Sequence, residues 1–138
     1  MPNCEPVSAR FVYLDSSAFA KLLMAEPEST SLRQFLRRRP RQASAALLRT
    51  EAMRAARRVD GRLVPAIRSA LARLLLVRLT PDLLDRAGSL DPPEIRSLDA
   101  IHLAAALSLG DDLGQFVTYD ETMAEAARSL NFNVASPR

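Results

Sequence analysis

Four acidic residues stand at positions from which a folded chain could bring their carboxylates together. Asp15 directly follows a β-rich run, and Asp120 lies one residue beyond a later one. Asp99 falls in the first turn of a predicted helix, and Glu51 falls one or two turns into another. Carboxylates that share a site repel one another unless a cation neutralises them, and Mg²⁺ and Mn²⁺ prefer such oxygen ligands. The four acids therefore predict a divalent-metal site.

Each of these acids also has a purely structural interpretation. Asp15 and Asp120 could be helix N-caps, which is a common use of aspartate. Asp99 in a first turn is favoured by the helix dipole, whatever its function. Glu51 could pair with Arg54 at i+3 on an exposed helix face. The position of a single acid does not decide between the structural and the metal-binding interpretation. Only the arrangement of all four acids together can do so.

The elements that must position these acids alternate along the chain between short β-rich runs and longer helical patterns. The strand-like runs are residues 10–14, 42–45, 76–79, 116–118 and 132–134. Such alternation predicts an α/β fold, in which a parallel sheet carries helices on both faces. In an open sheet of this kind, ligands bind at the carboxyl ends of the strands, near the point where the strand order reverses. Asp15 and Asp120 are expected at that edge.

Several helix boundaries carry local signals. Thr80 and Pro81 are typical of an N-cap followed by the first helical residue. We expect Ser97 to cap an Ala/Leu-rich helix and Asp120 to open the next one. Asn131 falls where a helix end often needs a left-handed residue.

Length and composition indicate one soluble domain spanning residues 1–138, with residues 1–9 as a flexible tail. Apolar residues make up 48% of the 138 residues and charged residues 25%, which excludes a disordered chain. The uninterrupted apolar runs are far too short for a membrane span. The N-terminus has no readable secretory signal, and the lone cysteine, Cys4, has no partners for a disulfide or a zinc site. We therefore expect a cytoplasmic protein with no membrane partner.

The basic residues are almost all arginine. The formal net charge is only +3, but 18 of the 19 basic residues are Arg. A GC-rich genome would produce this bias by itself, whereas arginine also suits phosphate binding. One local cluster comprises Arg37, Arg38, Arg39 and Arg41, and we expect it either to bind RNA or to be a solvated helix end.

Four short segments together resemble the acidic motifs of the PIN-domain family, in particular the VapC-type ribonuclease toxins of VapBC toxin–antitoxin systems. They are Val12–Ala18, Arg49–Glu51, Ser97–His102 and Val117–Asp120. A single Leu-Asp-Ser-Ser is a weak signal, but four motifs in order on the expected elements are fairly specific. The resemblance extends from Phe11 to Pro137. Asn131 departs from it, because many relatives carry glycine there.

The resemblance implies a PIN-like three-layer fold with five parallel strands, and a Mg²⁺- or Mn²⁺-dependent endoribonuclease. It implies that Asp15, Asp99 and Asp120 hold the metal, with Glu51 as a further ligand or as the holder of a metal-bound water. Ser17 and Thr118 are expected to hydrogen-bond the ligands or the phosphate. A cognate VapB-type antitoxin and a homodimer are the implied protein partners.

Other functions fit less well. Phosphatases with a strand-end aspartate need a second Asp two residues later, where this chain has Ser17; receiver domains need a late lysine, and the only lysine is Lys21. The Rossmann and P-loop patterns are absent. A PIN scaffold that binds RNA or a protein without cutting, and a metal-dependent DNA nuclease, remain alternatives. His102 lies on the same helix side as Asp99, and a structural role is favoured for it because oxygen-ligand sites rarely need histidine.

Overall fold

Five parallel strands form one sheet in the order β3-β2-β1-β4-β5 in the computed structural model, which describes residues 10–138. The strands are β1 (Phe11–Leu14), β2 (Gln42–Ala45), β3 (Leu75–Val77), β4 (Leu113–Val117) and β5 (Val134–Ala135). The helices are α1 (Ser16–Leu23), α2 (Ser29–Arg37), α3 (Leu48–Val59), α4 (Val64–Ala72), α5 (Pro81–Gly88), α6 (Ser97–Leu107) and α7 (Glu121–Ser129). Two 3₁₀ turns, η2 (Gly61–Leu63) and η3 (Gly110–Asp112), complete the described chain.

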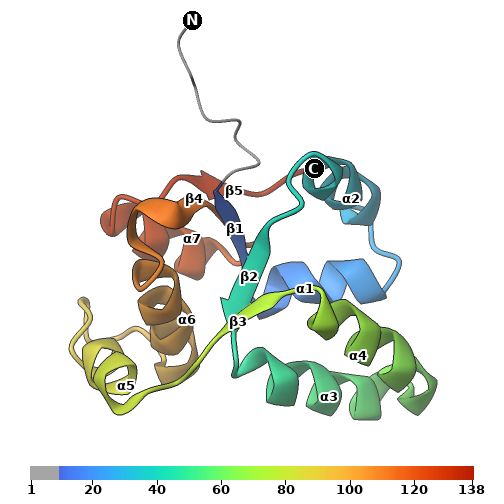
Figure 1. The fold of residues 1–138 in the computed structure, drawn as a ribbon, viewed down its shortest axis with the longest axis horizontal. Coiled ribbons are helices and arrows are strands. Elements are labelled where there is room, and N and C mark those ends of the chain that lie inside the picture. Colours follow the sequence, from blue (N-terminus) through green and yellow to red (C-terminus); the bar gives the residue numbers. More distant parts are fainter. Residues whose placement is uncertain (1–9) are drawn as a thin grey trace, which may run out of the picture.

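The helices form two layers with the sheet between them. Helices α5, α6 and α7 lie on one side of the sheet, and α1, α2, α3 and α4 lie on the other (Figure 1). This arrangement confirms the expected three-layer α/β fold. The strand order reverses between β1 and β4, which pair directly, so the switch point lies where the sequence placed it.

The core on the α6 side is built from aromatic rings of the strands and small residues of the helix. Tyr13 stacks on Phe116 with ring centroids 5.2 Å apart, and Phe116 stacks on Phe132 at 5.5 Å. Across from them, α6 buries Leu103 and the run Ala104–Ala106 completely. Small side chains let the helix backbone come close to the sheet, and this close packing positions Asp99 at the start of the same helix.

The boundary signals in the sequence are mostly confirmed. Thr80 caps α5 through a bond from the Leu83 amide, and Asn131 has a φ of 66°. The expectation for Ser97 is wrong, because Arg96 is the N-cap of α6 and no side chain caps it. Thus Ser97 is the first helical residue.

Four strands differ in extent from the prediction, and the first begins at Phe11 rather than at residue 10. The third strand covers 75–77 rather than 76–79, and the last covers 134–135 rather than 132–134. The fourth begins at Leu113, earlier than expected. The sequence did not indicate this start, because Gly114 and Gln115 have low strand propensity. Pairing with β1 holds these residues in a strand, at a point where the β1–β4 register shifts.

The predicted flexible tail, residues 1–9, lies outside the described residues. Within residues 10–138, no helix is both long and apolar enough to cross a membrane.

Candidate active site

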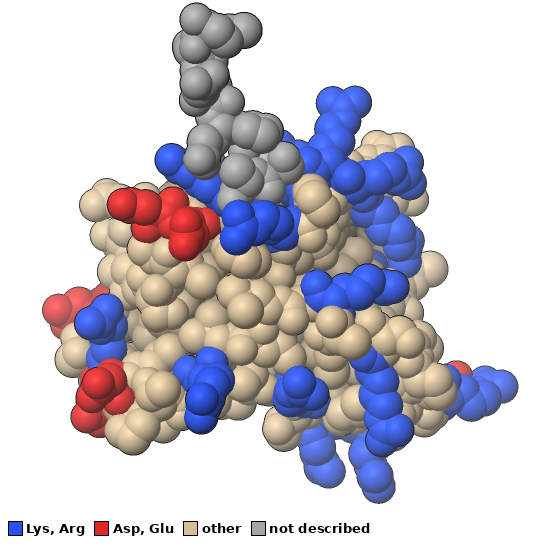
Figure 2. Space-filling model, in the orientation of Figure 1, with Lys and Arg blue, Asp and Glu red and all other residues tan. Residues whose placement is uncertain are grey.

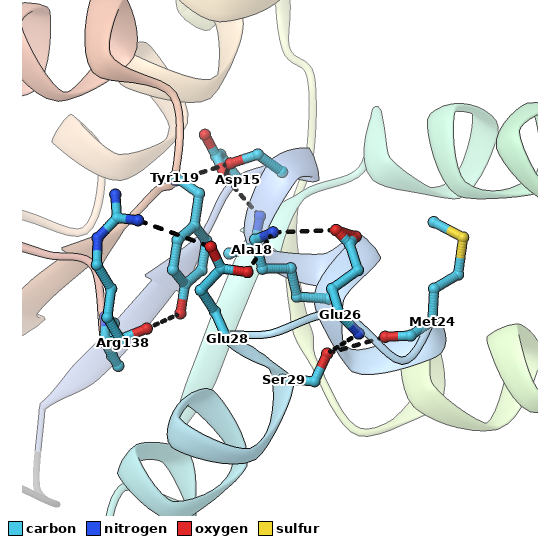
Figure 3. Close-up of polar contacts among 11 residues, drawn as sticks. Asp15, Ala18, Met24, Glu26, Glu28, Ser29, Tyr119 and Arg138 are labelled. Atoms are coloured by element: carbon cyan, nitrogen blue, oxygen red, sulfur yellow. Dashed lines mark hydrogen bonds and ion pairs between the residues drawn. The ribbon is translucent and has the colours of Figure 1, made fainter.

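Asp15 is a buried carboxylate at the carboxyl end of β1. Its side chain is only 2% exposed, and it also serves as the N-cap of α1. Its Oδ1 atom accepts hydrogen bonds from the Ala18 amide at 3.0 Å (Figure 3) and from the Ser17 hydroxyl at 2.7 Å. Burial raises the pKa of Asp15 above its ordinary value, and these hydrogen bonds offset part of the rise.

Thr118 joins the ends of β1 and β4. Its hydroxyl donates to Oδ2 of Asp15 at 2.5 Å and accepts from the Asp120 amide at 3.1 Å. Ser17 makes a second link, because its hydroxyl accepts from the Tyr119 amide at 3.0 Å. Both hydroxyls thus contact an expected metal ligand, in the supporting position that the sequence resemblance implied for them.

Asp120 and Asp99 face each other from α7 and α6. Asp120 caps α7 through its Oδ1 atom, which accepts from the Met123 amide at 3.1 Å. Asp99 is half-buried in the first turn of α6. Burial raises the pKa of Asp99, and the negative charges of Asp120 and Asp15 raise it further. The carboxylates of Asp120 and Asp15 are therefore close enough to affect the ionisation of Asp99.

Glu51 is held by a buried histidine. Its Oε1 atom lies 2.8 Å from Nε2 of His102, and Nδ1 of the same ring lies 2.7 Å from the Tyr13 hydroxyl. His102 is 1% exposed and Tyr13 is fully buried. Burial raises the pKa of Tyr13 well above its ordinary value, so the phenol keeps its proton and can donate it to Nδ1 of a neutral imidazole. The ring proton is then on Nε2 and is donated to the Glu51 carboxylate.

These contacts can be compared with the structural and functional interpretations that the sequence left open for each residue. Asp15 and Asp120 are helix caps, and the same carboxylates lie at the shared sheet edge, so the two interpretations do not exclude each other. Glu51 pairs with His102 rather than with Arg54. The favoured structural interpretation of His102 is correct in that both ring nitrogens are satisfied, but its contact with Glu51 ties it to the site.

The donor set has the chemistry of a site for a hard divalent cation. It offers carboxylate oxygens that repel one another, and within residues 10–138 none of the three aspartates is ion-paired with a lysine or arginine. In the described part of the chain, however, no three His, Cys, Asp or Glu side chains are already close enough to hold a metal ion. The residues fit the expected cation in type, and they would have to draw closer around it.

Two hollows adjoin the acids. One is a cleft between the α6 start and α7, lined by Glu94, Arg96, Asp99, Asp120 and Glu125 among others. The other is an apolar groove between α1 and α3, which begins at Glu51 and continues past Ala52 and Ala56 to the exposed Val59. The site thus opens toward an acidic cleft on one side and an apolar groove on the other.

The arginine cluster that the sequence singled out lies toward the amino ends of the strands, whereas the acids lie at their carboxyl ends. Arg39 donates to the Gln115 side chain at 2.9 Å, and Arg41 lies over the Phe11 ring at 4.2 Å. Arg41 directly precedes β2 and Phe11 begins β1, whereas the acids follow the strand ends. Arg37 and Arg38 are exposed beside them on α2. RNA binding by this cluster stays a prediction. The cluster does not lie beside the acids, so its position does not support that prediction.

Sequence reasoning missed two polar arrangements near the site. The Tyr13–His102–Glu51 chain joins three elements, and its only sequence signal is that the chain's single histidine lies three residues after Asp99. The second joins Lys21 to Glu26 and Glu28, each at 3.0 Å, with Arg138 at 3.6 Å from Glu28 (Figure 3). This network joins Arg138 to the α1–α2 connection. Its residues do not have the i+3 or i+4 spacing of helical ion pairs, so the sequence did not indicate it.

Comparison with known proteins agrees with the geometry. The PIN domain family model matches residues 12–129. Ribonuclease VapC46 of Mycobacterium tuberculosis is 50% identical over 126 residues, covering 91% of this chain and 97% of that protein. Ribonuclease VapC47 from the same species is 40% identical, with 91% and 96% covered. The crystal structure of M. tuberculosis VapC20, a toxin that cleaves the sarcin–ricin loop, superposes with a TM-score of 0.73 at 17% identity, covering 91% and 99% of the two chains.

Proposed function

The chain belongs to the PIN-domain family, and from this membership we propose that it is a VapC-type toxin endoribonuclease that uses Mg²⁺ or Mn²⁺. The observation that supports the metal dependence is that the negative charges of Asp120 and Asp15 raise the pKa of Asp99, while none of these three aspartates is paired with a lysine or arginine in the described chain. A group of carboxylates in this state is poised to take up a divalent cation.

The three aspartates would hold the ion, and Glu51 would be either a further ligand or the acceptor for a water beside it. When bound, the cation supplies a nucleophilic water at neutral pH and neutralises charge on the scissile phosphate. Thr118 and Ser17 keep Asp15 oriented through their hydroxyl hydrogen bonds. His102 orients Glu51 by donating the Nε2 proton to it.

The apolar groove between α1 and α3 is the place that we assign to the antitoxin. It starts at Glu51, and its walls are apolar side chains such as Phe19, Leu23 and Ile67. An amphipathic segment of a VapB-type partner would bury its apolar side there, and its polar end would reach the acids. We also expect a homodimer, and we expect the enzyme to act on RNA in the cytoplasm.

The decisive experiment is RNA cleavage by purified protein with and without chelator. We expect no cleavage in EDTA and recovery with Mg²⁺ or Mn²⁺. Asp99→Asn, purified in the same way, controls for contaminating nuclease and should be inactive with either metal. Full activity of the wild type in excess EDTA would refute the metal dependence. Cleavage of DNA of matched sequence under the same conditions would assign the alternative substrate, and RNA binding without any cleavage would assign the inactive scaffold.

A further inference from the structure

Charge is divided unevenly between the two helical layers. Residues 10–78, which include α1–α4, hold fifteen of the Lys and Arg residues and five of the Asp and Glu residues. Residues 79–138, which include α5–α7, hold four and ten respectively. Figure 2 shows blue side chains over α2, α3 and α4 with very little red among them, whereas acidic side chains appear over the other half. Genome composition can replace lysine by arginine, but it does not sort charges onto one layer.

Part of this basic layer forms a surface that we call the α3–α4 arginine face. It consists of six exposed residues, Arg49, Arg54, Arg57, Arg58, Arg68 and Arg73. Within residues 10–138 none of the six makes a hydrogen bond or an ion pair, unlike Arg62, which pairs with Asp60 at 3.0 Å. Neighbouring like charges without counter-charges destabilise the fold, so their presence suggests an anionic partner.

The face leads directly to the candidate active site. Arg54 and Arg58 follow Glu51 at i+3 and i+7, so the three residues share one side of α3 and span about 10 Å along the helix. On the other side of the site, the cleft between α6 and α7 is lined by Glu94 and Glu125 together with two of the aspartates. Arg96 also lines that cleft, but its acidic residues outnumber it, so a polyanion approaches the aspartates more favourably along α3.

We propose that the α3–α4 arginine face is the path along which the backbone of single-stranded RNA enters the candidate active site. The inference rests on the proposed ribonuclease function and gives that site a direction of approach. Guanidinium groups bind phosphate oxygens in a forked geometry, and their exposure on the outside of the helix leaves the forks available. An acidic segment of a protein partner would also be attracted here, and the experiment below separates it from RNA.

The test compares two pairs of exposed, unpartnered arginines. Arg54→Gln/Arg58→Gln removes two charges from the face, and the control pair Arg86→Gln/Arg128→Gln removes two charges from α5 and α7 in the other helical layer. Affinity for a short fluorescent single-stranded RNA is measured by anisotropy at several salt concentrations, in EDTA so that no cleavage occurs. We expect the first pair to weaken binding and to reduce the slope of log affinity against log salt by about 1.4, at about 0.7 per phosphate contact.

The control pair should leave both the affinity and the slope unchanged. Equal effects of the two pairs, or no effect of the first, would overturn the proposal, because binding would then follow total charge or another surface. Unchanged RNA affinity with weakened binding of the co-expressed antitoxin would also overturn it and assign the face to the protein partner. Failure of the proposed function is distinguishable, since that would appear as RNA bound through this face but not cleaved when Mg²⁺ or Mn²⁺ is supplied.

Discussion

Substituting His102 in two different ways separates the structural role of this residue from its role at the site. The ring accepts from Tyr13 at Nδ1 and donates to Glu51 at Nε2, at 2.7 and 2.8 Å. The amide oxygen of His102→Asn can occupy the position of Nδ1, so this variant keeps the Tyr13 contact and loses Glu51. The amide nitrogen of His102→Gln can occupy the position of Nε2, so this variant keeps the Glu51 contact and loses Tyr13.

The expected magnitudes follow from burial. In His102→Gln the fully buried Tyr13 hydroxyl loses its hydrogen bond to Nδ1, at a cost of about 1–3 kcal/mol in unfolding free energy. For a chain of this length that is a fall in Tm of roughly 4 °C per kcal/mol. In His102→Asn the Glu51 carboxylate loses its donor, but its side chain is 18% exposed and water can replace the bond. The carboxylate then loses its orientation, for which we expect a loss of activity of about 10–100-fold.

The two variants should therefore rank oppositely. His102→Gln should be the less stable and the more active, and His102→Asn the more stable and the less active, in thermal melts and in RNA cleavage assayed well below the lower Tm. Tyr13→Phe combined with His102→Gln should cost less stability than the two changes added together, because the unsatisfied hydroxyl is gone. If activity follows stability through all of these variants, the histidine only supports the core and the orienting role is refuted.

Further outcomes are expected for the acids and the partner. Because burial and neighbouring charges raise the pKa of Asp99, its ionised form destabilises the metal-free fold; the difference in Tm between Asp99→Asn and the wild type should be largest near neutral pH and should shrink as the pH falls through the raised pKa toward 3.8. A difference that grows on acidification would contradict this. Asp120→Asn and Asp120→Ala should both abolish cleavage, but only Asp120→Ala should lose about 1 kcal/mol of stability, since asparagine still caps α7. Co-expression with a neighbouring VapB-type gene should give a tight complex without ribonuclease activity; a complex that cleaves RNA at the free rate would refute docking beside the acids.

The predictable features of this structure are those that depend on residues close together in the sequence. Alternation of β-rich and helical runs gave the α/β class, and strand-end acids gave the edge at which Asp15 and Asp120 meet. The Thr80 cap and the left-handed Asn131 were equally local. The early start of β4 was not predictable, because Leu113–Gln115 becomes a strand only through pairing with β1.

The unpredicted features of the site depend on contacts between distant segments. Tyr13 and His102 are 89 residues apart, and nothing in either neighbourhood marks the pair. The place of the cluster Arg37–Arg41 in the fold could not be predicted for a related reason. A run of arginines shows that charge is concentrated in sequence, but only the packing of α2 shows which edge of the sheet receives it.

The cap and ligand interpretations of the acids could not be separated by sequence because this fold makes them coincide. In a parallel sheet with helical crossovers, the helix that directly follows a strand begins just beyond the carboxyl end of that strand, as α1, α3, α5 and α7 do here. Asp15 and Asp120 are N-caps, and Asp99 and Glu51 lie in first turns, so all four acids sit at the positive ends of helix dipoles. These dipoles help to hold the carboxylates together when no cation is bound. An Asp→Asn change keeps the cap and removes only the charge, which is why that substitution, and not Asp→Ala, isolates the role of the acids in the chemistry.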